Sequence, residues 1–408
     1  MSTVVPLASA ASELQQIGVK KCFDEPYRIF FPLGILWVLI GVLYWVPVAF
    51  GTALEGVPSM VHVYVQVYGF LWSFVVGFLG TAVPRFSGTR WMTRMETLSL
   101  LSLSVICMGL LLTQRFAYAH LVFLVSSLVL AGGMGYRVFT RKKEIPATLA
   151  CIPFALLAAV LGGISLCVTF YGLSVNGAWY VMGKGLLMQG MMLLFLMGVG
   201  GFLIKSILHV NVAQGPGVAV QSTQSLRGQW ILFSCVSIVV LLSYGIESFL
   251  AARTGAVLRA AVVTWVCVWQ IGIWRWPRSG KLTAVTLWFG LWLMVVGLWG
   301  EAVFSETYRL AFRHLTLMGG FAYSIFAVAT RVILSHAGCH ALLARRYWPF
   351  TTASVLMFIG LITRFSVEFI PMHARHHLGY AAGAWGCGVL VWSATVLPFS
   401  FRAMSSSR

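Results

Sequence analysis

The chain has 408 residues, of which 59% are hydrophobic and only 9% are charged, whereas about 25% of the residues in an ordinary soluble domain are charged. This composition excludes a water-soluble protein, and apolar runs that recur from Ile29 almost to Phe399 predict a single membrane domain. The net charge of +18 does not indicate nucleic-acid binding, because Lys and Arg form short groups between apolar runs, which suits contact with anionic lipid headgroups.

A helix that crosses a membrane needs about 20 apolar residues, since its backbone has to satisfy its own hydrogen bonds in hydrocarbon. Long unbroken runs exclude a β-barrel, so the predicted fold is an all-α polytopic membrane protein, a bundle of about twelve transmembrane helices. We expect one transmembrane domain, residues 29–400, between a cytoplasmic segment, residues 1–28, and a cytoplasmic tail, residues 401–408. The predicted spans cover residues 29–50, 61–83, 96–114, 116–138, 146–171, 179–208, 229–251, 256–274, 282–304, 308–334, 347–370 and 378–400.

With this arrangement, most Lys and Arg residues fall on the side of the N-terminus, in groups such as residues 141–143 and the pair Arg345 and Arg346. Positively charged loops stay in the cytoplasm, so both termini are predicted to be cytoplasmic. Residues 1–20 lack the basic-then-apolar order of a cleavable signal peptide, and the first apolar run is therefore expected to remain as the first helix.

The eight cysteines are scattered, without CxxC or CxxCH, so neither a disulfide framework nor covalently attached c-type haem is indicated. The chain also lacks a Walker loop, GxSxG, HExxH and a dinucleotide fingerprint. Hydrolase and nucleotide-driven functions therefore have no support in the sequence.

Two histidines lie at the same predicted depth in different helices: His62 in the span 61–83 and His314 in the span 308–334. Neutral imidazole ligates haem iron, copper and zinc, and a haem wedged between helices needs axial nitrogens from two helices at similar depth. His62 and His314 satisfy that condition. The alternative is that each histidine merely hydrogen-bonds a carbonyl or a lipid headgroup at the membrane surface.

Two other groups of potential ligands lie at the ends of predicted spans. At the cytoplasmic end of the span 308–334, a helical continuation would place His336, Cys339 and His340 on one face, where thiolate and imidazole suit copper or zinc. In the last external loop, His373 and His377 have helical i, i+4 spacing and could share a metal, with His376 beside them. A loop with incidental polar residues explains either group equally well.

Ionisable residues inside predicted spans are costly in hydrocarbon and usually face the bundle interior, where they pair or move protons. They are Lys184, Glu247, Glu301, Arg331, Arg364 and Glu368. Lys184 and Arg364 also lie near helix ends, where snorkelling to the interface is the alternative. The methionines Met188, Met191 and Met192 could bind Cu(I) but are more typical of core packing.

Two spans carry residues at fixed spacings that match a known family. The first set is His62, Gly69, Gly77, Phe78, Thr81, Ala82, Val83, Pro84 and Gly88. The second set is His314, Gly319, Thr330, Arg331, His336 and Gly338. Together with YRIFFPLG at residues 27–34, both sets resemble the NnrS family without a gap. The chain departs from the family pattern at two places. Typical members read HxHE where this chain has HVYV at residues 62–65, and GGR-x-x-P where it has GGFLIK at residues 200–205. The resemblance is therefore to a divergent member.

The resemblance implies a bacterial inner-membrane protein that carries haem and copper and helps cells tolerate nitric oxide. It implies cofactor binding by His62, His314, Arg313, Arg331 and His336, with His62 and His314 as axial ligands and Arg313 as a partner of a haem propionate. Because the chain lacks CxxCH, the haem is expected to be non-covalent b-type haem. Copper is expected, if at all, among the remaining histidines and Cys339.

The expected partners are membrane lipids and nitric oxide or another small diatomic ligand, without nucleic acid. Whether the protein turns over, as a haem- and copper-dependent oxidoreductase acting on nitric oxide, is left open by the residues, as are the electron donor and the oligomeric state. A secondary transporter of a small molecule or ion is the alternative function, because twelve spans with buried charges also describe carriers. A structural assembly factor is a third hypothesis.

Overall fold

The computed structural model describes residues 14–16, 19–52, 58–209, 223–277, 281–304, 306–344 and 347–404. Arg345 and Arg346 lie outside the described residues, as do parts of the two predicted cytoplasmic ends, residues 1–13, 17–18 and 405–408. Twelve helices are long and apolar enough to cross a membrane, which confirms the predicted fold class. We number them span 1 to span 12 in chain order.

The first six spans occupy residues 27–208. Their elements are α3 (Tyr27–Leu43) and α4 (Val46–Ala49) in span 1; α5 (Pro58–Tyr64), η1 (Val65–Leu71) and α6 (Trp72–Ser87) in span 2; α7 (Arg94–Leu112); α8 (Phe116–Phe139); η2 (Ala147–Ala150) and α9 (Cys151–Phe170); and α10 (Ala178–Gly185), η3 (Leu186–Gly190), α11 (Met191–Val199), η4 (Gly200–Ile204) and α12 (Lys205–His209) in span 6.

The last six spans occupy residues 226–401. Their elements are α13 (Thr223–Phe249); α14 (Ala252–Trp265) and η5 (Val266–Ile271); α15 (Leu282–Val303); α16 (Glu306–His314), η6 (Leu315–Ala322) and α17 (Tyr323–His336) in span 10; α19 (Trp348–Ser366); and η7 (Pro371–His373), α20 (Ala374–Val396) and η8 (Leu397–Phe401) in span 12. Each predicted span is present, and span 12 begins earlier than predicted because the polar segment from residue 371 continues as helix.

Spans 2, 6 and 10 form the centre of the bundle. In the most apolar window of each span, the buried share is 89% in span 2, 72% in span 6 and 78% in span 10, but 56% or less in every other span. They are also long, at 30, 31 and 31 residues, and among the described spans only span 12, with 31 residues, is comparable. Most residues in these three windows therefore face protein, and these helices are the first place to look for a site inside the bundle.

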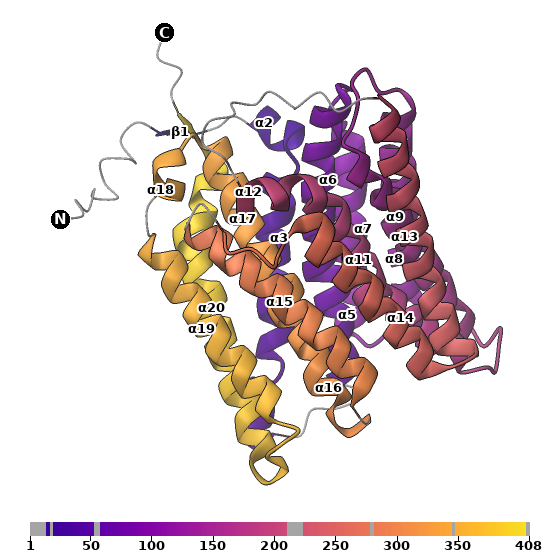
Figure 1. The fold of residues 1–408 in the computed structure, drawn as a ribbon. Coiled ribbons are helices and arrows are strands. Elements are labelled where there is room, and N and C mark those ends of the chain that lie inside the picture. The colour runs from indigo at the N-terminus through magenta and orange to yellow at the C-terminus, as the bar shows by residue number, and fades with distance from the viewer. Residues whose placement is uncertain are drawn as a thin grey trace.

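Each central span contains a π-helical segment close to a polar residue. In span 2, η1 begins shortly after His62; in span 6, η3 begins shortly after Lys184; and in span 10, η6 begins directly after His314. π-Helical turns are rare and are frequently found at functional sites. The three segments therefore mark one level of the bundle, near the end that carries α5 and α16 (Figure 1).

The opposite end of the bundle holds both ends of the described chain (Figure 1). The short strands β1 (Leu14–Gln16) and β2 (Arg402–Met404) pair antiparallel there, next to α2 (Val19–Asp24) and α18 (His340–Ala344). Arg28 is fully buried at this end, where its guanidinium donates to the Ser400 carbonyl and, at 2.6 Å, to Glu25. We call this the terminal end, and the other the cavity end.

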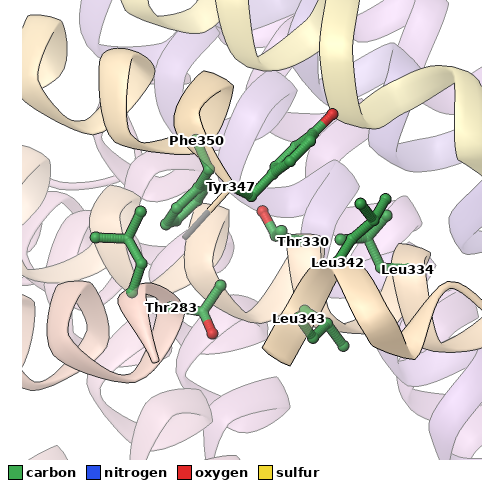
Figure 2. Close-up of a pocket in the computed structure, with 8 residues that line it drawn as sticks. Thr283, Thr330, Leu334, Leu342, Leu343, Tyr347 and Phe350 are labelled. Atoms are coloured by element: carbon green, nitrogen blue, oxygen red, sulfur yellow. The ribbon is translucent and has the colours of Figure 1, made fainter. Parts of the chain in front are cut away.

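The described space beside Thr330 at the terminal end is small. Thr330, one of the motif residues, donates to the Phe326 carbonyl at 2.7 Å and accepts from Trp392 Nε1 at 2.8 Å. Figure 2 shows Thr330 among Leu334, Leu342, Tyr347 and other residues around a cavity of about 10 Å³. That is about the space of one water molecule, so Thr330 joins span 10 to span 12 here and leaves no room for a cofactor.

Candidate cofactor cavity

A cavity of about 380 Å³ lies at the cavity end, between the central spans and spans 1, 11 and 12. Its walls are mostly apolar. Their polar residues include His62, Gln66, Lys184, Arg313, His314, Arg364 and Glu368. Small-molecule and cofactor sites are typically apolar concavities of roughly 300–1,000 Å³ with a few converging polar groups. We call this space the central cavity.

The central cavity brings together His62 and His314, which lie 252 positions apart in the sequence and were predicted to share a depth. His62 Nδ1 donates to the Gly41 carbonyl at 2.8 Å, and His314 Nδ1 donates to the Leu310 carbonyl at 2.9 Å. A carbonyl only accepts, so the ring proton of each histidine sits on Nδ1 and the lone pair sits on Nε2. Metal-binding histidines have this arrangement.

Neighbouring rings and close helix contacts hold the two imidazoles in place. The Trp45 ring meets the His62 ring edge to face at 5.6 Å between centroids. On the other side, span 10 lies against α15 so closely that a Cβ on Gly300 would stand 2.0 Å from the Phe312 ring. Glycine allows this close approach, which packs α16 tightly against α15. His314, the last residue of α16, is held in position by the same contact.

Arg313, the neighbour of His314, is tied to a buried carboxylate. Its Nε donates to Glu301 at 2.9 Å, and Glu301 also accepts from Gln189 Nε2 at 2.5 Å and from Thr316 Oγ1 at 3.3 Å. The Glu301 side chain is 2% exposed. The Glu301 carboxylate fixes the Arg313 guanidinium through Nε. The two terminal amino groups of Arg313 have no hydrogen-bond partner among the described residues.

Two more cations line the central cavity. Arg364 donates from Nη1 and Nη2 to Glu368 at 2.9–3.1 Å, so that its charge is balanced one helical turn away. Lys184 lies 5.6 Å from the centre of the Tyr180 ring, and none of the ion pairs formed by described residues includes it. Among the described residues, Lys184 is therefore the cation of the cavity wall that has no carboxylate partner.

Arg331 and His336, also predicted to bind the cofactor, lie at the terminal end and do not line the central cavity. His336 Nδ1 donates to Glu25 at 3.1 Å, and its Nε2 accepts from Arg85 at 3.3 Å. Burial raises the pKa of the Glu25 carboxyl, but hydrogen bonding by His336 and the charge of Arg28 outweigh burial and lower that pKa from 4.5 to about 2. His336 therefore links span 10 to the N-terminal segment through Nδ1 and to span 2 through Nε2.

Cys339 and His340 follow His336 but are not on one continuous helix with it. The helix α17 ends at His336, and Gly338 adopts a left-handed backbone conformation with φ of +76°, which glycine tolerates without steric cost. His340 is exposed, and burial raises the pKa of the Cys339 thiol. The turn at Gly338 thus removes the shared helical face on which the prediction of a metal site relied.

His373, His376 and His377 lie at the start of span 12, at the cavity end but outside the central cavity. The His373 and His377 rings stack with centroids 6.5 Å apart, and His377 Nδ1 is 2.9 Å from Ser366 Oγ. Across the described ranges no three His, Cys, Asp or Glu side chains gather closely enough to hold a metal ion. A metal here would need ligands beyond these side chains.

Sequence reasoning singled out His62 and His314 but did not connect them with Lys184, Arg364 and Glu368. Gln66 was missed altogether; it lines the cavity and donates from Nε2 to the Val38 carbonyl at 3.2 Å. A polar amide inside an apolar span is a usable signal, since such residues usually face the bundle interior. Met188 lines the cavity, whereas Met191 and Met192 are buried in the core.

The fold and the cavity define the chain as a polytopic membrane protein whose two central histidines share one intramembrane cavity. Residues 21–403 match the family model described as NnrS protein, so the chain belongs to the NnrS family. That match covers nearly the whole chain and includes both spans whose motifs indicated the family. No curated protein matches the chain.

Proposed function

We propose that this chain is a haem-binding membrane protein of the nitric oxide response, with one b-type haem held in the central cavity. The observation that carries the proposal is that His62 and His314, from two different central helices, line one cavity of about 380 Å³ with Nδ1 of each ring bonded to a backbone carbonyl. Haem iron held by both histidines would bind a diatomic ligand such as nitric oxide in place of one of them.

The residues present fit that group. The Nε2 lone pairs of His62 and His314 would hold the iron, the apolar walls would contact the porphyrin, and the cations at the wall would pair with its propionates. Arg313 offers its terminal amino groups in a fork that matches a carboxylate, while Glu301 holds its Nε. Lys184 supplies the positive charge that no neighbouring carboxylate balances within the described residues.

Around this site we propose the remaining features. The protein is a multi-pass protein of the bacterial inner membrane, with residues 29–400 as a single transmembrane domain, both terminal segments in the cytoplasm and the central cavity toward the opposite face. Arg331 and His336 act in stabilising the terminal end. Copper, which the family resemblance implies, would be held by the exposed His373 and the half-buried His377 together with ligands from outside the described side chains.

The test is a reduced-minus-oxidised absorption spectrum, with iron and copper analysis, on detergent-purified protein from haem-replete cells. Wild type is expected to show a Soret band, and His62→Ala and His314→Ala are each expected to lose it. Wild type without iron or a Soret band overturns the proposal. A Soret band that survives both substitutions would move the haem elsewhere in the fold.

A secondary transporter is less well supported. Substrate sites in such carriers are typically formed by helices that unwind near the membrane midplane. In the described part of the chain, spans 2, 6 and 10 stay helical through their middle, with π-helical segments in place of unwound backbone. The cofactor function therefore accounts for more of the cavity than transport does.

A further inference from the structure

A second, smaller cavity lies in the same three central helices. It measures about 60 Å³ and is lined by residues of α3, α6, α11 and α17, among them Phe74, Val75, Met192, Phe195, Ser324 and Ala329. Ser324 is the only polar residue in this wall. We call this space the midplane pocket.

The midplane pocket sits where the hydrocarbon is deepest. Phe74, Met192 and Ser324 are each close to the middle of spans 2, 6 and 10, which run Pro58–Ser87, Ala178–Leu208 and Glu306–His336. Since the hydrocarbon core is about 30 Å thick and a helix rises 1.5 Å per residue, the middle of each span lies near the bilayer centre. Water is scarce there and apolar solutes collect.

The pocket continues the central cavity by about one helical turn. Phe70 lines the cavity and Phe74 lines the pocket; Met188 lines the cavity and Met192 lines the pocket. Residues four apart lie one above the other on a helix. Spans 2 and 6 therefore each contribute side chains to both spaces. On span 10, Ala322 lines the cavity and Ser324, two residues later, lines the pocket.

Aromatic rings connect the walls of the two spaces. The Phe70 and Phe74 rings meet edge to face at 5.3 Å, and the Phe326 ring lies 5.9 Å from Phe70 and 6.4 Å from Phe74. Met188 in the wall of the cavity and Met192 in the wall of the pocket have unbranched, adaptable side chains. On its far side the pocket reaches the half-buried side chains of Phe78 and Val199, at the edge of the central bundle.

We propose that the midplane pocket is an access route for a small uncharged diatomic gas, which passes from the membrane hydrocarbon into the central cavity. Such a molecule transfers favourably from water to an apolar environment, and a dry apolar pocket of this kind holds small apolar guests. The inference rests on the proposed haem function and adds the path by which the ligand arrives. No bond is made or broken along it.

The test uses carbon monoxide as the probe on purified, dithionite-reduced protein, with rebinding followed after flash photolysis. Ala329→Leu fills the midplane pocket at a residue that does not line the central cavity. Phe74→Ala removes an aromatic ring between the walls of the two spaces. We expect the second-order association rate to fall at least several-fold in Ala329→Leu and to rise in Phe74→Ala, with the Soret position and haem content unchanged. Ala261→Leu adds the same bulk to an exposed position of α14 and is expected to leave the rate at the wild-type value.

Each outcome decides the proposal. If both pocket variants bind carbon monoxide at the wild-type rate, the gas reaches the haem another way and the pocket is filled by side chains or a lipid acyl chain. If Ala329→Leu does not fold, Phe74→Ala alone decides, since a rate no faster than wild type also overturns the route. Loss of the Soret band in wild type would instead overturn the proposed haem function.

Discussion

The two ends of span 10 carry the same kind of residue in opposite surroundings. At the cavity end, His314 bonds a carbonyl of its own helix through Nδ1 and faces a cavity of about 380 Å³. At the terminal end, His336 is held between Glu25 and Arg85, and the nearby cavity beside Thr330 measures about 10 Å³.

The difference shows that the role of a histidine in a membrane helix depends on whether its second ring nitrogen is hydrogen-bonded or free. A ring with one nitrogen on a backbone carbonyl and the other toward open space suits a ligand, whereas a ring with both nitrogens bonded suits a structural link. The family motif includes both histidines, so the motif alone does not separate the two roles.

The largest expected effect is on haem occupancy. His314→Gly should purify without haem, because the axial nitrogen is lost, and should regain a Soret band when imidazole is added during reconstitution. His336→Gly should keep its haem with or without imidazole. The measurement is Soret absorbance per mole of protein across an imidazole titration. Haem loss in His336→Gly alone would reverse the roles of the two ends.

The next effect is on stability at the cavity end. Glu301→Leu leaves Arg313 without its buried partner, and breaking a buried pair in this way costs about 3–5 kcal/mol. The double variant Glu301→Leu with Arg313→Leu should recover a large part of that loss, since no charge is stranded. Denaturant unfolding in detergent measures both. Equal stability of the single and double variants would mean that the pair is not coupled.

A smaller effect is expected on haem affinity. Lys184→Met removes the cavity cation that lacks a neighbouring carboxylate and should weaken haem binding about tenfold, a loss of roughly 1.4 kcal/mol. Lys205→Met, on an exposed position of the same span, is the matched control and should leave affinity unchanged. Haem titration of the purified apoprotein gives both values. Identical affinities would place the propionates away from span 6.

The smallest effect concerns acid stability of the terminal end. The pKa of Glu25 is lowered to about 2 in the folded protein from an ordinary 4.5, so its contribution to stability is complete above pH 4.5 and is lost as the pH falls toward 2. Glu25→Gln should therefore lower the midpoint of thermal unfolding at pH 7 and flatten its dependence on pH in that window. A variant with the wild-type pH profile would show that the carboxyl is not linked to folding.

The sequence predicted the spans well because hydrophobic length is a local property, and each of the twelve helices follows from its own residues. It also identified His62 and His314, from depth and from the family motif. It did not place them in one cavity with Lys184 and Arg364. Hydrophobic periodicity predicts which face of a helix is buried, but not which other helix packs against that face.

The same limit explains the terminal end. His336 was grouped with Cys339 and His340, its neighbours in the sequence, whereas the structure gives it Glu25, which lies 311 positions away. The turn at Gly338 depends on a left-handed backbone, which glycine permits but does not impose, so the residue type alone does not predict it.

The π-helical segments of spans 2, 6 and 10 have a consequence for how these helices are encoded. A residue in an α-helix advances the chain by about 100° around the axis, and a π-helical turn accommodates one residue more than an α-helical turn. The segment before α6 therefore sets the angular phase of His62 independently of the close contacts that Gly77 makes further along span 2. Deleting Tyr68 from η1, a residue that does not line the central cavity, would turn His62 by roughly a quarter turn relative to α6. Ser59 and Val63 of the cavity wall would turn with it.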